Sequence, residues 1–404
     1  MRHHRLFAGT SAVAVFALAP ASVPAYAETV RPTSGAADAV RENPGPVDAE
    51  GADAEPGAVR NPQVGGALLT TRGIAVHRDA PRLPKVAASS FLIADAETGQ
   101  VLAARNAHGR FLPASTLKIL TALTLIPKLD KAKKIKPSHE ACNTEGSAVG
   151  LVPTVSYSVD DLLRALMVVS GNDAAVALAE ANGGLKPTLA AMNAEAKRLQ
   201  AYNTVAKTPN GLDKPGQVSS AYDLALLARD GLKNPTFRGY IATKVADFPA
   251  PKGKTYQIAN HNRLLWQYKG GLGVKNGYTS KARASFVGAA KRNGHTIIVT
   301  LMRSDAPFWE DAKEMLDWGF AARGKVAPVG QLVDPVDPAA EKAKAAPAAP
   351  LPTAPVAGAQ TALQGSGDSL PIPLLAAVGA GGVVGAVAFT LYRRRRARRS
   401  EPSL

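Results

Sequence analysis

Proline and glycine are concentrated at the two ends of this chain of 404 residues, and their distribution limits what can fold. Residues 28–84 are rich in Ala, Pro, Gly, Asp and Glu and have almost no aromatic side chains. Residues 326–370 are mainly Ala, Pro and Val with scattered charges. Such segments cannot bury enough apolar surface to become ordered. We therefore expect a disordered arm at 28–84, one folded unit at 85–325, and a proline-stiffened linker at 326–370.

The first 27 residues have the pattern of a secretory signal peptide. Basic residues come first, residues 6–18 are apolar, and Ala25-Tyr26-Ala27 supplies the small side chains of a cleavage site. An uncleaved membrane anchor is the alternative, but the Ala-x-Ala pattern favours cleavage. We predict that residues 1–27 are a signal peptide.

The other end of the chain has the pattern of a membrane anchor. Residues 371–392 are apolar and uncharged, and this length spans a bilayer. Six arginines follow in residues 393–404, and positive charge next to a span stays in the cytoplasm. We predict a transmembrane helix at 371–392, a basic cytoplasmic tail at 393–404, and a single-pass cell-membrane protein with its folded unit outside. A cell-wall sorting signal looks similar, but residues 351–354 lack its Thr-Gly pair.

The formal net charge of the chain is +16, and part of it lies in the terminal arginines. A mildly basic folded unit suits an anionic cell-wall polymer, although a solvated basic surface explains the charge equally well. The juxtamembrane position explains the arginine tail better than a nucleic-acid site does. No nucleic-acid partner is expected.

Strand-like and helical patterns follow one another in blocks within the folded unit. Residues 89–94 and 100–104 flank a Thr-Gly turn and predict a hairpin. Helical patterns occupy residues 158–181, 185–200 and 219–231. Strand patterns occupy residues 274–278, 285–290 and 296–301, and residues 308–320 predict a closing helix. This order favours an α/β (α+β) fold, with an antiparallel sheet and a helical lobe.

Metal, disulfide and cofactor sites have little support. Cys142 is the only cysteine, which excludes an internal disulfide. The seven histidines are scattered without metal-binding spacing, and no phosphate loop or dinucleotide fingerprint is present. We expect neither a metal nor a cofactor.

The stretch around Ser115 predicts the start of a helix that carries a candidate catalytic serine and lysine. Pro113 suits the first positions of a helix, where no backbone N–H is needed. Ser115 and Lys118 are three residues apart, so on a helix they share a face. A serine hydroxyl becomes a nucleophile when a neighbouring base takes its proton, and a lysine with a lowered pKa can be that base. A capped surface helix with an ordinary lysine is the alternative.

Two later motifs favour the catalytic interpretation. Ser170-Gly171-Asn172 ends an apolar run, and Lys275-Asn276-Gly277 lies in a strand-like segment. Ser-x-x-Lys, Ser-x-Asn and Lys-x-Gly, in this order, are the signature of the penicillin-recognising serine enzymes. The amino-acid sequences at residues 94–102, 209–213 and 219–225 are also similar to those of that family.

Within this family, residues 87–320 most resemble the low-molecular-mass D-alanyl-D-alanine carboxypeptidases, peptidase family S11. The resemblance implies an antiparallel sheet flanked by helices with an all-helical subdomain, a β-lactamase/transpeptidase-like fold. It implies removal of the terminal D-alanine from peptidoglycan stem peptides through an acyl-enzyme on a serine, and acylation by β-lactams.

The resemblance also implies the role of each site residue. Ser115 would be the nucleophile, Lys118 its base, and Ser170 the proton relay to the leaving D-alanine. The substrate-binding residues would be Asn172, Lys275, Asn276, Gly277 and Thr279. The backbone N–H groups of Ser115 and Thr279 would bind the oxyanion.

One site residue departs from the family pattern, and two alternative functions remain open. Asn276 stands where the family usually has Thr or Ser, which puts substrate affinity and β-lactam sensitivity in doubt. A β-lactamase on the same fold needs a deacylating Glu, and residues 200–215 contain none. A non-catalytic wall-binding protein with a decayed site is supported only by Asn276.

Overall fold

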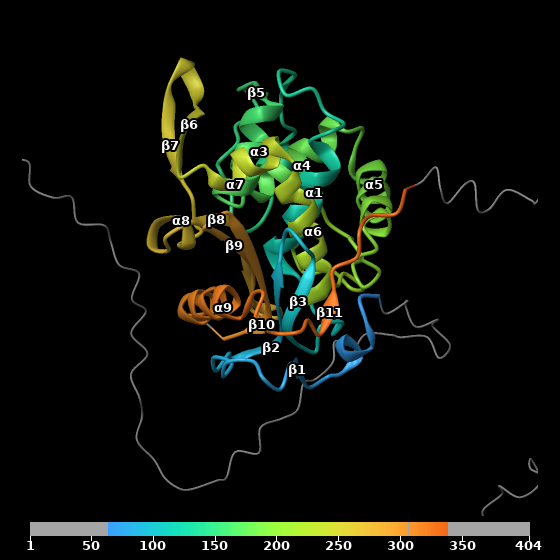
Figure 1. The fold of residues 1–404 in the computed structure, drawn as a ribbon. Coiled ribbons are helices and arrows are strands. Elements are labelled where there is room, and N and C mark those ends of the chain that lie inside the picture. Colours follow the sequence, from blue (N-terminus) through green and yellow to red (C-terminus); the bar gives the residue numbers. More distant parts are fainter. Residues whose placement is uncertain (1–63, 306, 338–404) are drawn as a thin grey trace, which may run out of the picture. The chain divides into compact units, whose positions relative to one another are not determined.

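The computed structural model describes residues 64–305 and 307–337, and Figure 1 shows their arrangement. The signal peptide, transmembrane helix and basic tail that the sequence predicts lie outside these residues. Within the described ranges, no helix combines the length and the apolar character needed to cross a bilayer.

An antiparallel sheet lies at the centre of the fold. Its strand order is β1-β3-β2-β10-β9-β8, and the short β11 also pairs with β3. The strands are β1 (Ile74–Val76), β2 (Ala88–Asp95), β3 (Gln100–Arg105), β8 (Gly271–Thr279), β9 (Arg283–Arg292), β10 (His295–Ser304) and β11 (Gly330–Gln331). Asn293 and Gly294 both have positive φ in the β9–β10 turn, as a two-residue hairpin turn requires.

Both faces of this sheet are buried against helices. Successive strand residues point to opposite faces, so Leu92 and Ile93 belong to two different core clusters. Helix α6 (Ala221–Lys233) contributes to the cluster of Leu92, and α9 (Trp309–Ala322) contributes to that of Ile93. A Cβ at Gly319 would lie 2.9 Å from the Ile93 side chain, so α9 packs closely on the sheet.

A helical lobe adjoins the sheet and lies above it in Figure 1. It contains α1 (Lys118–Leu125), α3 (Val159–Val168), α4 (Asn172–Ala181), α5 (Leu185–Arg198) and α7 (Pro235–Ala242). Short elements complete the described fold: α2 (His139–Cys142), α8 (Leu264–Gln267), the pair β4 (Lys134–Ile135) and β5 (Tyr157–Ser158), and the hairpin β6 (Val245–Pro249) and β7 (Thr255–Ala259). Ser158 and Asp161 form a reciprocal capping box that starts α3. An antiparallel sheet flanked by helices, with a helical lobe, confirms the predicted fold class for the described residues.

The folded region extends beyond the expected limits of 85 and 325, which corrects both boundaries. The 3-10 helix η2 (Ala67–Thr70) and β1 precede residue 85, and β11 follows residue 325. Leu69 and Leu332 are buried, and Gln331 N donates to Gly65 O over 2.7 Å. A few apolar side chains and backbone hydrogen bonds dock these segments on the sheet, although their overall composition resembles that of a linker.

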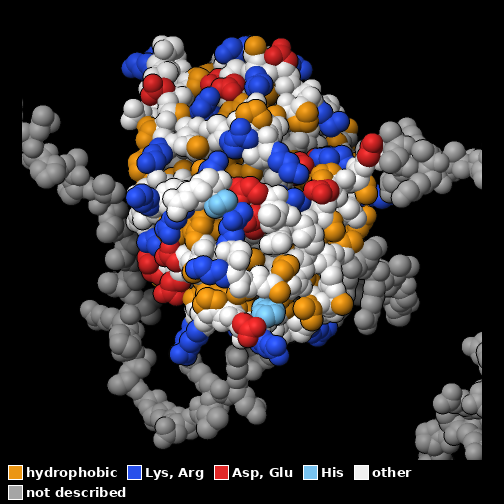
Figure 2. Space-filling model, viewed as in Figure 1, with side chains coloured by type: hydrophobic (Ala, Val, Ile, Leu, Met, Phe, Trp, Pro, Cys, Tyr) orange, Lys and Arg blue, Asp and Glu red, His pale blue; other side chains and the backbone are white. Residues whose placement is uncertain are grey.

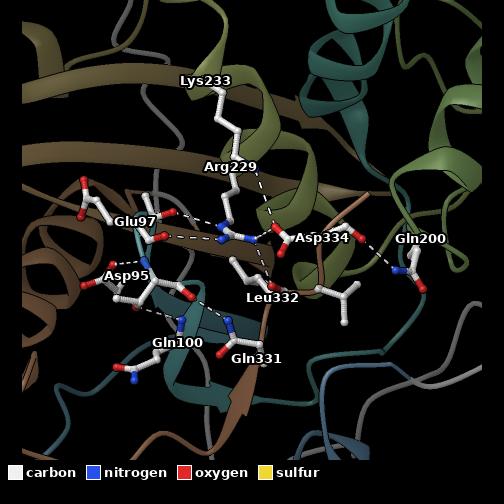
Figure 3. A network of polar contacts seen from close by, with 12 residues as sticks. Asp95, Glu97, Gln100, Gln200, Arg229, Lys233, Gln331, Leu332 and Asp334 are labelled. Atoms are coloured by element: carbon white, nitrogen blue, oxygen red, sulfur yellow. Dashed lines mark hydrogen bonds and ion pairs between the residues drawn. The ribbon is translucent and has the colours of Figure 1, made fainter. Parts of the chain in front are cut away.

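Arg229 of α6 fastens residues 332–334, which follow β11, to the β2–β3 turn (Figure 3). Its side chain is 9 % exposed, and its Nε donates to Ala96 O over 3.0 Å. Its Nη1 donates to Leu332 O over 3.1 Å and to Asp334 Oδ1 over 2.9 Å. One buried guanidinium therefore joins α6, the turn and the segment that leads out of the described fold.

Candidate active site

Ser115 lies on a short 3-10 turn, η3 (Ala114–Leu117), immediately before α1. The sequence predicts a helix start here, but the turn opens with a φ of 47° at its first residue. The Pro113 carbonyl accepts a hydrogen bond of 2.5 Å from Ser285 Oγ, which fastens the turn to β9. The sheet therefore holds the backbone of Ser115 in place.

The amine of Lys118 is fully buried and contacts three oxygen atoms. Its Nζ lies 2.9 Å from Ser115 Oγ, 2.7 Å from Asn172 Oδ1 and 2.6 Å from the backbone oxygen of Asn210. The predicted juxtaposition of Ser115 and Lys118 is present. Asn210 was missed because it acts through its carbonyl, and a backbone group leaves no signal in the sequence.

Ser170 and Asn172 lie at a break between α3 and α4, where the sequence predicts a continuous helical region. Ser170 has a φ of 61°, a left-handed conformation that costs a non-glycine residue on the order of 1–3 kcal/mol. Its hydroxyl is buried and has no hydrogen-bond partner among the residues that the structure describes. Asn172 Nδ2 donates to Glu145 O over 2.7 Å. Asn172 is thus held at both ends of its amide, while the Ser170 hydroxyl is left available.

Strand β8 brings the third motif beside Ser115. A Cβ at Gly277 would lie 2.5 Å from the backbone nitrogen of Ser115, so only glycine fits there. Lys275 is 1 % exposed, and its Nζ donates to Asn276 O over 2.9 Å. The Asn276 side chain is only half-buried.

Thr279, at the end of β8, is already engaged. Its hydroxyl donates to Asp213 Oδ1 over 3.0 Å and accepts a hydrogen bond of 2.9 Å from the backbone N–H of Ala282. Asp213 was not among the predicted site residues. Its carboxylate joins the loop after residue 207 to the end of β8.

Burial sets the protonation of both lysines. Burial, and then the positive charge of Lys275, hold the pKa of Lys118 well below its usual range, and the Asp173 carboxylate partly opposes this. Burial lowers the pKa of Lys275 to about 7. Neither amine forms a salt bridge with an acidic side chain in the described part of the chain. A neutral Lys118 amine can take a proton from Ser115.

These contacts together suit acyl transfer to a serine hydroxyl. The Ser115 hydroxyl comes from η3, and the Lys118 amine, with its lowered pKa, comes from α1. The unpartnered Ser170 hydroxyl comes from the α3–α4 break, and the Lys275 amine comes from β8. No group of three or more His, Cys, Asp or Glu side chains that could hold a metal ion occurs among residues 64–305 and 307–337.

Comparisons with known proteins give the family. A family model described as D-alanyl-D-alanine carboxypeptidase, peptidase S11, matches residues 76–306. The chain is 40 % identical over 257 residues to D-alanyl-D-alanine carboxypeptidase DacB2 of Mycobacterium tuberculosis, covering 62 % of this chain and 88 % of the relative. It is 34 % identical over 269 residues to D-alanyl-D-alanine carboxypeptidase DacF of Bacillus subtilis, covering 64 % of this chain and 69 % of the relative.

Solved structures agree with this assignment. The crystal structure of a D-alanyl-D-alanine carboxypeptidase from M. tuberculosis H37Rv matches with a TM-score of 0.61 and 37 % identity, over 65 % of this chain and 100 % of that one. The Streptomyces K15 DD-transpeptidase matches with a TM-score of 0.57 and 29 % identity, over 60 % of this chain and 100 % of that one.

The chain belongs to the S11 peptidase family of D-alanyl-D-alanine carboxypeptidases. Its function is that of a serine-type D-alanyl-D-alanine carboxypeptidase in peptidoglycan metabolism, as the sequence predicted.

Proposed function

We propose that Ser115 is the acylated nucleophile and that Lys118 is its base. The observation that carries this proposal is the 2.9 Å contact between Lys118 Nζ and Ser115 Oγ in a site that lowers the lysine pKa. The neutral amine takes the hydroxyl proton as Oγ attacks the carbonyl carbon of the penultimate D-alanine. The bond to the terminal D-alanine breaks, an ester to Ser115 forms, and water later hydrolyses that ester.

Ser170 relays a proton to the nitrogen of the leaving D-alanine: its hydroxyl gives up its own proton and receives the one that Lys118 took from Ser115. The buried Ser170 hydroxyl has no hydrogen-bond partner within the described residues, so it is available to form a hydrogen bond with a substrate amide. Asn172 orients Lys118 through Oδ1, and the fixed amide of Asn172 presents a polar edge to the substrate.

Lys275 attracts the free carboxylate of the substrate, which selects a peptide end. Asn276 contributes an amide donor where the family usually has a hydroxyl. The backbone N–H groups of Ser115 and Thr279 bind the developing oxyanion, and Gly277 keeps β8 close to Ser115. β-Lactams, which also carry a carboxylate and an acylating carbonyl, react at the same serine.

The substrate is the stem peptide of peptidoglycan, and the surface charge agrees with a polymer that carries carboxylates. Lys and Arg side chains are spread over the face seen in Figure 2, with smaller groups of Asp and Glu among them. The formal net charge of the whole chain is +16. A basic surface raises the local concentration of an anionic substrate.

The enzyme acts at the outer face of the cell membrane as a single-pass protein. The support is the sequence pattern of the two ends: a signal peptide at 1–27, and an apolar, uncharged span at 371–392 followed by the arginine-rich tail. Treatment of whole cells with a protease tests this topology, since the catalytic domain is then digested while the tail is protected.

Intact-mass analysis with penicillin tests the chemistry. We expect a stable penicilloyl adduct on the wild type and none on Ser115→Ala, together with D-alanine release from a D-Ala-D-Ala peptide by the wild type alone. An adduct that persists on Ser115→Ala would remove Ser115 from its role. Penicillin that is consumed without an adduct would indicate a β-lactamase. Penicillin left intact, with no D-alanine released, would indicate a non-catalytic wall-binding protein.

A further inference from the structure

Gln217 is a fully buried side chain that binds both ends of one loop. Its Oε1 accepts hydrogen bonds from Thr208 N and Thr208 Oγ1, each of 2.9 Å, and from Lys207 N over 3.1 Å. Its Nε2 donates to Leu212 O over 2.7 Å. One amide thus closes residues 207–212 into a loop through its acceptor and its donor.

The loop is also fixed from within. Gly211 N donates to Thr208 Oγ1 over 3.1 Å, and Leu212 N donates to Asn210 Oδ1 over 3.0 Å. These bonds orient the Asn210 carbonyl relative to Thr208 and Leu212, and Thr121 Oγ1 holds the preceding Pro209 O over 2.6 Å. Thr208 and Leu212 are both held by Gln217.

The loop backbone touches the catalytic serine and lysine. The Asn210 carbonyl oxygen lies 2.6 Å from Lys118 Nζ. A Cβ at Gly211 would lie 1.9 Å from Ala114 O and 3.1 Å from Ser115 N, so the loop packs directly against the η3 turn that carries Ser115.

The number of N–H groups on a neutral lysine amine gives this contact a chemical meaning. A neutral –NH₂ group has two N–H donors and one lone pair. Two oxygens other than Ser115 Oγ surround Lys118 Nζ, namely Asn172 Oδ1 and Asn210 O. If both N–H groups are donated to these oxygens, the lone pair is directed at Ser115 Oγ, which is the arrangement that a general base needs.

We propose that Gln217 is a positioning residue for acylation, which acts by holding the Asn210 carbonyl against the Lys118 amine. The proposal rests on the proposed roles of Ser115 and Lys118. A glutamine suits the task because the loop requires an acceptor at one end and a donor at the other.

Three variants of the full chain test the proposal. Gln217→Met keeps the volume and removes every hydrogen bond, and Gln217→Glu keeps the acceptor. Asn193→Leu is the matched control. Asn193 holds the neighbouring Ala206 by hydrogen bonds of 2.9 and 3.0 Å, and in the described structure its side chain does not hydrogen-bond to residues 207–212. Stopped-flow fluorescence with a reporter penicillin separates the acylation rate constant from the dissociation constant of the first complex, and thermal unfolding monitors stability.

We expect Gln217→Met to lower the acylation rate constant by about 10²-fold, the cost of a misplaced catalytic group, while the dissociation constant stays within about threefold. Gln217→Glu should acylate at an intermediate rate that falls as pH rises, because an ionised carboxylate cannot donate to Leu212 O. Asn193→Leu should lose thermal stability and keep the wild-type acylation rate constant.

Two results would overturn the proposal while leaving the proposed function intact. One is an unchanged acylation rate constant in the Gln217 variants. The other is an equal loss in Asn193→Leu, which would make Gln217 merely structural. If Gln217→Met does not fold, Gln217→Glu provides the test. The proposal is then contradicted if the acylation rate constant of Gln217→Glu has the same pH dependence as that of the wild type. A wild type without a penicilloyl adduct would overturn both proposals, since there would be no acylation to position.

Discussion

The positive charge of Lys275 lowers the pKa of the Lys118 amine, and both side chains are almost fully buried in one site. Burial is the larger cause of the low Lys118 pKa, and Lys275 adds to it. The lysine proposed to bind substrate therefore also helps to keep the base neutral.

Removal of the Lys275 charge should shift the acidic limb of the pH–rate profile for acylation. Lys118 accepts a proton only when neutral, so acylation rises as pH increases through its pKa. In Lys275→Met one cause of the lowered Lys118 pKa is gone, the pKa rises, and the acidic limb moves to higher pH. The loss of a charged hydrogen bond of about 1.5–3 kcal/mol should also slow acylation by about 10–10²-fold at neutral pH. The pH dependence of penicillin acylation measures both effects, and an unmoved limb contradicts the first.

Lys275→Arg should abolish the alkaline limb. The pKa of Lys275 is lowered to about 7, so in the free enzyme a rise in pH above that value removes the charge that attracts the substrate carboxylate. Arginine stays protonated throughout. We expect the rate constant for acylation at low penicillin concentration to fall above about pH 7 in the wild type and to remain level in the variant, since arginine does not lose its proton in this range. A matching fall in Lys275→Arg would assign the limb to another group.

Gly277→Ala should disrupt acylation with little loss of fold. The added methyl group would lie 2.5 Å from Ser115 N, so β8 and the η3 turn that carries Ser115 must move apart. Displacement of a reacting group by about 1 Å costs roughly 10²-fold in rate. Gly239→Ala is the control, because nothing lies within 4 Å of the position of its Cβ on α7. It should keep full activity and gain about 0.5–1 kcal/mol of stability. Acylation assays and thermal unfolding of both variants provide the comparison.

Asn276→Thr should strengthen binding of substrates that carry a carboxylate. The Asn276 amide reaches further from β8 than a threonine hydroxyl, which is the usual donor at this position in the family. A well-placed hydrogen bond to a charged group is worth about 1.5–3 kcal/mol, so the dissociation constant for penicillin should fall by about 10-fold or more. The acidic limb should not move, because Asn276 carries no charge. An unchanged or weaker affinity would show that the asparagine is suited to this site.

Arg229→Met should destabilise the fold far more than Asp334→Asn. The Arg229 side chain is 9 % exposed, so in the methionine variant the carbonyls of Ala96 and Leu332 lose a shielded donor. Each hydrogen-bonding group left unsatisfied in this way costs about 1–3 kcal/mol. The Asp334 side chain is 76 % exposed, so loss of its ion pair should cost less than about 1 kcal/mol. Urea unfolding measures the free energy of unfolding of both variants. An equal loss of that free energy in the two variants would contradict the prediction.

Local sequence patterns determined much of the fold and the identity of the motif residues. The Ser158 cap, the Asn293-Gly294 turn and the strands β2, β3, β8, β9 and β10 depend on residues close together in the chain. Their short-range hydrogen bonds and alternating burial can be recognised without the fold. Ser115 and Lys118 were predictable for the same reason, because three residues separate them.

The tertiary structure alone decided which distant groups surround Lys118. Asn210 lies 92 residues away along the chain and contributes a backbone carbonyl, which every residue possesses, so no side-chain pattern marks it. The break that leaves the Ser170 hydroxyl without a partner in the described region depends on how α3 and α4 pack. The low pKa of Lys118 depends on burial and on a second lysine from β8. Desolvation and charge proximity are properties of the assembled site, and a sequence motif only supplies the groups on which they act.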